Sequence, residues 1–118
     1  MFRALTWHPD AIEESMFREY LRAFTQPGTI RCGLEDYRAA ASTDVADDEA
    51  DADKKLRCPV YAIWGEFGKM HTLFDVVETW REKAHDVRGN SLPSGHFIPE
   101  EMPEELTAAL LPFLREGS

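Results

Sequence analysis

The apolar run at residues 60–64, VYAIW, constrains the fold most, because it is continuous rather than alternating and stops at Gly65. A continuous apolar run of this length is typical of a strand covered on both faces, as in a parallel sheet packed between helices. A segment with helical periodicity follows over about residues 72–84, with Thr72 as its expected N-cap, and a weaker extended run follows at residues 87–92. The sequence therefore predicts a strand–helix–strand unit with parallel strands.

Ligands of open parallel sheets bind outside the carboxyl ends of the strands, which here lead into residues 65–71 and 93–100. The second loop contains His96, whose imidazole could carry a proton to or from water or a nucleophile. The alternative interpretation of His96 is a surface or helix-capping residue. The chain contains no Cys-x-x-Cys, no histidine pair with metal-ligand spacing and no glycine-rich phosphate loop, so we expect neither a metal site nor a cofactor.

The amino-terminal third is predicted to be helical. Apolar residues recur every three or four positions over residues 9–24 and again over residues 29–41, with Gln26-Pro27-Gly28 between them and Thr29 as the expected cap of the second helix. Residues 44–55, DVADDEADADKK, read as a solvated linker or a short exposed helix. They lack the central glycine and distal glutamate of a calcium loop. A last helix is expected to begin at Pro103.

Composition narrows the classes of partner. An apolar fraction of 43% and 11% aromatic residues indicate a globular chain, and a formal net charge of −9 disfavours nucleic acids and anionic membranes. No segment approaches the roughly 20 apolar residues of a membrane span. The first ten residues lack the apolar core of a secretory signal, so we expect a cytoplasmic protein in which Cys32 and Cys58 pack as small apolar groups.

No nucleophile accompanies His96 in the sequence. A G-x-S-x-G turn is absent, and Ser94 lies on a loop without the strained turn that would expose its hydroxyl. Taken alone, the residues supply a base without a nucleophile.

Three segments resemble the carboxyl-terminal half of α/β-hydrolases, in the branch of haloacetate dehalogenases with epoxide hydrolases as neighbours: DYRAAASTD at 36–44, RCPVYAIWGE at 57–66 and LPSGHFIPEEMPEEL at 92–106. The run KMHTLFD after the strand is similar to haloacetate dehalogenases in particular. The resemblance implies a partial α/β-hydrolase fold, with two parallel strands and flanking helices preceded by a helical pair from the cap domain. Its expected divisions are cap helices at residues 1–43, an acidic linker at 44–57 and core at 58–118.

The same resemblance implies roles for two residues. His96 matches the histidine that activates water to hydrolyse an aspartyl-ester intermediate, and Tyr37 matches a cap tyrosine that helps to bind the departing halide. Where many relatives carry the acid that orients the histidine, this chain has Gly68, with Glu66 early and Asp75 late. Haloacetate dehalogenases take that acid from the strand before the cap, so its absence agrees with this branch. Trp7-His8 reverses the order of the family's halide-binding pair, and no role is transferred to it.

Two hypotheses follow. In the first, the chain is the carboxyl-terminal portion of a haloacetate-dehalogenase-like hydrolase acting on a small halogenated acid or related substrate. The nucleophile would then lie in the family's amino-terminal half, so the chain alone would be inactive. In the second, it is a small non-catalytic α/β module that associates with itself or with a partner protein through an exposed sheet edge. Both predict apolar surface that the chain does not cover by itself.

Overall fold

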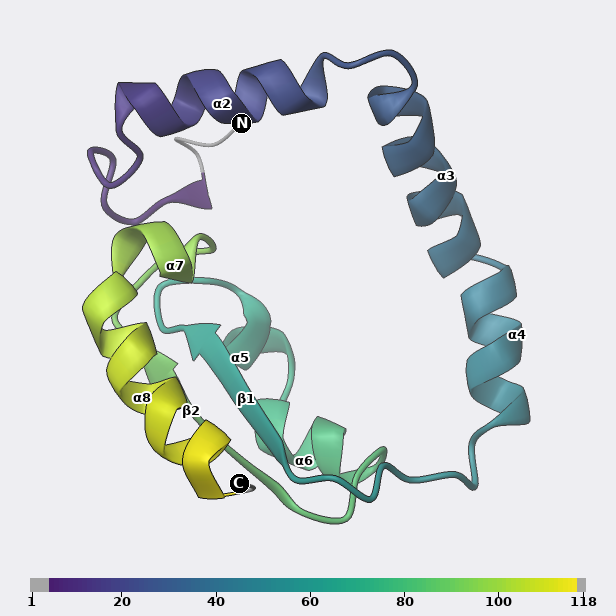
Figure 1. Ribbon diagram of the computed structural model, residues 1–118. Coiled ribbons are helices and arrows are strands. Elements are labelled where there is room, and N and C mark those ends of the chain that lie inside the picture. Colours follow the sequence, from purple (N-terminus) through teal and green to yellow (C-terminus); the bar gives the residue numbers. More distant parts are fainter. Residues whose placement is uncertain (1–4, 117–118) are drawn as a thin grey trace. The chain divides into compact units, whose positions relative to one another are not determined.

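The computed structural model describes residues 5–116, which divide into two compact units (Figure 1). One unit comprises residues 13–54. The other combines residues 5–12 with residues 55–116 and contains both strands.

The unit of residues 13–54 consists of three helices: α2 (Glu14–Phe24), α3 (Thr29–Ala40) and α4 (Thr43–Ala50). The first two confirm the predicted helices, with corrected starts. α2 begins at Glu14 rather than Pro9, because residues 7–12 form bends and turns instead of a helical turn. α3 is capped by Gly28 in the left-handed conformation, with φ of 88°, so Thr29 is its first residue rather than its cap.

The acidic stretch forms α4, the short exposed helix that was one of its two expected forms. None of the three helices contains a buried residue, and apolar side chains such as Leu21, Phe24 and Leu34 are at least half exposed. Within this unit the amphipathic faces are therefore not covered. The expectation that both cysteines pack as apolar groups is wrong, since Cys32 and Cys58 are exposed.

In the other unit, β1 (Val60–Gly65) and β2 (Val87–Leu92) pair in parallel, with register from Val60↔Val87 to Gly65↔Leu92. The predicted strand–helix–strand unit is thus present. Gly89, which weakened the prediction of β2, faces Ala62 in this register. A Cβ at position 89 would lie 2.2 Å from the Ala62 carbonyl oxygen, so the close pairing of the strands requires glycine there.

The crossover between the strands differs from the prediction. Instead of one helix over residues 72–84, the chain forms α5 (Met70–Leu73) and α6 (Val76–Arg81). Phe74 is extended between them, with φ of −139° and ψ of 146°. The Asp75 carboxylate accepts a hydrogen bond from the Glu78 N–H at 3.1 Å, so Asp75 rather than Thr72 caps the main crossover helix.

After β2 the chain forms α7 (Ile98–Glu101), which the sequence did not predict, and then α8 (Pro103–Glu116), which begins where expected. Figure 1 shows the two strands between α8 and the α5–α6 segment. Phe113 of α8 packs against Tyr61 with ring centroids 5.3 Å apart. Arg88 lies over the Phe113 ring and forms an ion pair with Glu116.

The apolar core of this unit is small and consists of Ala62, Ala84, Val87 and Leu92. Of β1 only Ala62 and Gly65 are buried, and its other residues are half-buried. The strand that the sequence predicted to be covered on both faces is therefore only partly covered by its own chain. No helix in the described part of the chain is both long and apolar enough to cross a membrane.

Candidate active site

The loops that leave the carboxyl ends of β1 and β2 lie against each other. The Glu66 N–H donates to the Leu92 carbonyl at 2.8 Å, and the Phe67 N–H donates to the Ser94 carbonyl at 3.0 Å. A Cβ on Gly65 would lie only 1.9 Å from the Gly95 carbonyl oxygen. Glycine at position 65 therefore permits the contact that forms this rim of the sheet.

His96 lies on the second of these loops, four residues beyond the end of β2. Its side chain is exposed, its ring makes an edge-on contact with Phe97 at 5.1 Å, and its backbone N–H donates to the Leu5 carbonyl at 2.9 Å. The backbone at His96 is thus fixed while the imidazole remains accessible. An accessible imidazole at this rim can exchange protons with water or a bound substrate.

Glu101, at the end of α7, is the residue of the site that sequence analysis missed. It is only 8% exposed. One carboxylate oxygen, Oε2, accepts from the backbone N–H groups of Trp7 at 2.8 Å, His8 at 3.0 Å and Gly95 at 3.0 Å. The other, Oε1, accepts from the Phe97 N–H at 3.2 Å. A single buried side chain therefore joins the loop around His96 to residues 7–8.

Two opposed effects act on the pKa of Glu101. Burial raises the pKa, but the four backbone N–H donors favour the ionised carboxylate and bring the pKa below its usual value. Glu101 is thus a charged, fully hydrogen-bonded group inside the unit.

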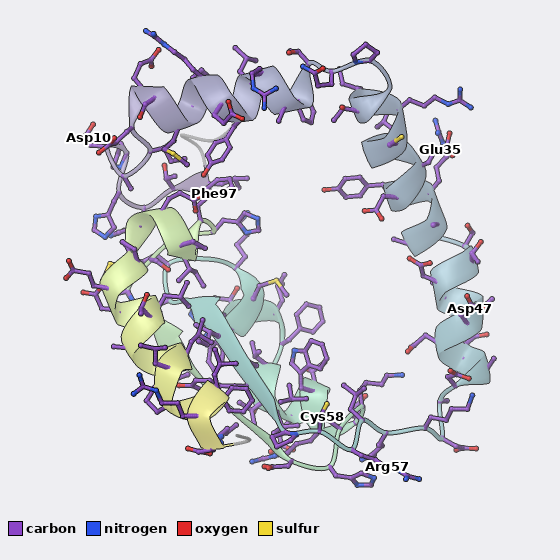
Figure 2. All side chains as sticks on the ribbon, in the orientation of Figure 1. Asp10, Glu35, Asp47, Arg57, Cys58 and Phe97 are labelled. Atoms are coloured by element: carbon purple, nitrogen blue, oxygen red, sulfur yellow. The ribbon has the colours of Figure 1, made fainter. Side chains whose placement is uncertain are left out.

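Residues 5–8 form the third part of the rim. The Trp7 ring stacks on Phe67, from the loop after β1, with centroids 4.1 Å apart and an interplanar angle of 24°. A Cβ on Gly95 would lie 2.6 Å from the Leu5 carbonyl oxygen and 2.7 Å from the Trp7 nitrogen. Residues 5–8 therefore lie close against the loop that carries His96. Phe97, the residue after His96, is the N-cap of α7 (Figure 2).

Three other residues considered in the sequence have different surroundings. Tyr37 lies in α3, is 76% exposed and belongs to the other unit. Glu66 is exposed on the loop after β1, and Asp75 is engaged as the cap of α6. In the part of the chain that the structure describes, no three metal-ligating side chains lie close enough together to hold an ion.

No family model matches the chain. Two curated proteins are similar to it over 108 residues: a fluoroacetate dehalogenase from Burkholderia sp., 30% identical, and a soluble epoxide hydrolase from Corynebacterium sp. strain C12, 34% identical. The matches cover 92% and 91% of this chain but only 36% of each relative. The chain thus spans about a third of their length.

Solved structures likewise match nearly all of this chain and little more than a third of their own length. A candidate α/β-hydrolase from Nostoc sp. PCC 7120 is 46% identical, with a TM-score of 0.92 over 96% of this chain and 39% of its own. A candidate acyltransferase from Salmonella enterica is 41% identical, with a TM-score of 0.93 over 98% of this chain and 38% of its own. The predicted resemblance and the predicted partial α/β-hydrolase fold are confirmed, and these shares agree with a carboxyl-terminal portion.

Proposed function

We propose that this chain, which carries part of an α/β-hydrolase fold and is similar to fluoroacetate dehalogenase and epoxide hydrolase, supplies the general base for hydrolysis of an aspartyl-ester intermediate. His96 is that base. One observation carries the proposal: the imidazole is accessible on a loop at the carboxyl rim of the parallel strands, and the backbone beneath it is fixed.

The reaction has two steps. In the first, a carboxylate oxygen of a nucleophilic aspartate attacks the carbon that bears the halogen, the carbon–halogen bond breaks, and halide leaves with the bonding electrons. In the second, His96 takes a proton from water as the water oxygen attacks the ester carbonyl. In the collapse of the tetrahedral intermediate the ester C–O bond breaks, the departing alkoxide takes the proton of the added hydroxyl, and the aspartate carboxylate and the hydroxy acid result. His96 then passes its proton to solvent. Opening of an epoxide would form the same type of ester, with the ring oxygen as leaving group.

Tyr37 completes the proposed chemistry of the first step. A phenolic hydroxyl can donate a hydrogen bond to a departing halide, which stabilises the developing negative charge. The side chain is 76% exposed in its own unit, so the hydroxyl is available for such a role.

We propose that the nucleophile lies in a part of the hydrolase that this chain does not span. The chain covers 36% of the fluoroacetate dehalogenase, and it offers no aspartate on a nucleophile turn. We therefore propose that the chain has no activity by itself, that it acts in the cytoplasm, and that a complementing segment or chain supplies the aspartate. A metal or cofactor has no part in the proposed reaction.

Halide release tests this proposal. In a chimera, this chain replaces the matching 108-residue segment of the Burkholderia fluoroacetate dehalogenase. We expect the chimera to release fluoride repeatedly from fluoroacetate, the chain alone to release none, and His96→Ala to abolish repeated turnover. His85→Ala, which removes an exposed histidine beside β2, is the matched control. Full turnover in His96→Ala would rule out the assignment of the base.

Association through the sheet is the second candidate function, and the incomplete covering of β1 is the observation that favours it. A two-stranded sheet is marginal on its own, and uncovered strands pair readily with other chains. Light scattering on the purified chain tests this function. We expect a mass above that of one chain, rising with concentration, whereas a compact monomer at all concentrations would contradict association.

A further inference from the structure

We infer that Glu101 is a positioning residue, a buried anionic clamp that holds the His96 loop against residues 5–8 and so fixes the base for hydrolysis. This inference rests on the proposed function of His96 for its catalytic consequence, while the clamp itself rests on the hydrogen bonds of the described residues. Glu101 acts through the backbone and is not a catalytic residue.

The clamp fixes the backbone on both sides of His96. Gly95 donates to Oε2 at 3.0 Å and Phe97 donates to Oε1 at 3.2 Å, while the N–H of His96 donates to the Leu5 carbonyl at 2.9 Å. Three consecutive N–H groups therefore have defined acceptors. Because a short loop with all its donors engaged has few alternative conformations, the Cα–Cβ direction of His96 is set by these bonds.

The second half of the clamp reaches far along the sequence. The N–H groups of Trp7 and His8, which precede Glu101 by more than 90 residues, share its Oε2 with the N–H of Gly95. Trp7 in turn stacks on Phe67, which follows β1. Glu101 thus joins the residue 5–8 segment and the β2 loop, and the Trp7 stack extends the connection to the β1 loop.

In the described part of the chain, the hydrogen bonds of Glu101 do not include one to the His96 imidazole. An orienting acid needs a free carboxylate oxygen that faces a ring nitrogen. Here Oε2 already accepts three backbone donors and Oε1 accepts a fourth. All four of these hydrogen bonds come from backbone N–H groups, so the carboxylate acts on the backbone of the loop.

Charge, as well as shape, matters for the clamp. Four N–H dipoles converge on one buried carboxylate, and hydrogen bonds to an ionised acceptor are about twice as strong as those between neutral groups. Glu101→Gln keeps the shape but provides only one acceptor oxygen. If that oxygen faces the three donors on the Oε2 side, the amide N–H₂ group must face the Phe97 N–H, and two donors then oppose each other.

Nuclear magnetic resonance of the full chain tests the clamp. Wild type is compared with Glu101→Gln and with Glu105→Gln, which makes the same charge change at an exposed position in α8. We expect amide exchange at Gly95 and Phe97 to accelerate by about tenfold or more in Glu101→Gln, as expected when a hydrogen bond to a charged acceptor is lost. We expect the His96 amide order parameter to fall from about 0.85 to below about 0.6, and Glu105→Gln to match wild type.

A pH titration of the wild-type chain covers the case in which Glu101→Gln does not fold. The amide resonances of Trp7, His8, Gly95 and Phe97 should shift together, with one midpoint below the ordinary glutamate pKa of 4.5. The His96 imidazole resonances should shift at that midpoint too. A residue that only stabilised the fold would leave the imidazole unaffected while the chain stays folded.

Different pH midpoints for the four amide resonances would overturn the clamp. An unchanged His96 order parameter in folded Glu101→Gln would also overturn it. Neither readout depends on turnover. Failure of the His96→Ala test would therefore remove the proposed reaction and leave the clamp in place, whereas failure here would remove the clamp and leave the reaction untouched.

Discussion

Ionised Glu101 gives this fold a defined response to acid. Burial raises the pKa of this carboxyl, but its four backbone donors together lower the pKa by more. In the folded chain the pKa therefore lies below the usual value of 4.5. A group whose pKa is depressed by folding stabilises the fold above its unfolded pKa. That contribution is lost as the pH falls through the folded pKa.

We predict that Glu101→Gln lowers the free energy of unfolding at pH 7 by about 1–3 kcal/mol, because buried donors lose their charged acceptor. The difference from wild type should shrink as the pH falls below 4.5, where the wild-type carboxyl also becomes neutral. Urea unfolding at a series of pH values measures both effects. Glu105→Gln serves as control, and a difference between wild type and Glu101→Gln that does not change with pH would contradict the prediction.

Gly65 is the second residue on which the rim depends. A Cβ there would lie 1.9 Å from the Gly95 carbonyl oxygen and 2.6 Å from that of Ser94, and both neighbours are backbone atoms that cannot turn aside. We predict that Gly65→Ala lowers the unfolding midpoint by the equivalent of about 1–3 kcal/mol. Gly33→Ala, inside α3 with nothing within 4 Å of the new Cβ, should be neutral or stabilising. Thermal unfolding compares them, and equal midpoints would contradict the close approach.

Of the two site residues, the sequence pattern predicted His96 but not Glu101. His96 could be singled out because it follows a predicted strand at the rim where parallel sheets bind ligands. Glu101 could not, because two of its four donors are the backbone N–H groups of residues 7–8, and nothing in the sequence spacing predicts that these lie near it. Its position between a predicted loop and a predicted helix, five residues beyond His96, was the only available signal.

Among the elements, the long and strongly patterned ones were predictable. The continuous apolar run gave β1, and the helical period gave α2, α3 and α8. The crossover was read as one helix because its apolar period continues through Phe74. The structure breaks it there because Asp75 caps α6 and an extended Phe74 precedes it. The four-residue α7 was missed because one turn has no period.

The cap of α6 gives a test at the scale of an element. Asp75→Ala removes the acceptor of the Glu78 N–H and should cost about 1 kcal/mol of unfolding free energy. Thr72→Ala, at the cap position that the sequence suggested, should cost less, because the Thr72 hydroxyl bonds only to the Lys69 carbonyl within its own turn. Urea unfolding measures the free energy of both variants. A larger loss of unfolding free energy for Thr72→Ala than for Asp75→Ala would contradict the assignment of Asp75 as the cap.

At the scale of the whole molecule, β1 is only partly covered by its own chain. The chain also matches only about a third of the length of larger hydrolases. Both observations agree with a sheet that is incomplete in this chain. The apolar pattern predicted the strand–helix–strand unit, and both hypotheses for the chain predicted apolar surface that it does not cover by itself. The sequence pattern could not supply the nucleophile, because the proposed aspartate is expected in a segment that these 118 residues do not contain.

We propose that His96 acts in the second step, and this role is tested by the intact mass of the His96→Ala chimera after exposure to fluoroacetate. We predict one fluoride released per chimera and a mass increase equal to one carboxymethyl group on the nucleophilic aspartate, which persists because water is not activated. The same chimera with His96 intact should show no lasting adduct. Rapid loss of the adduct from the His96→Ala chimera would show that His96 does not activate the water.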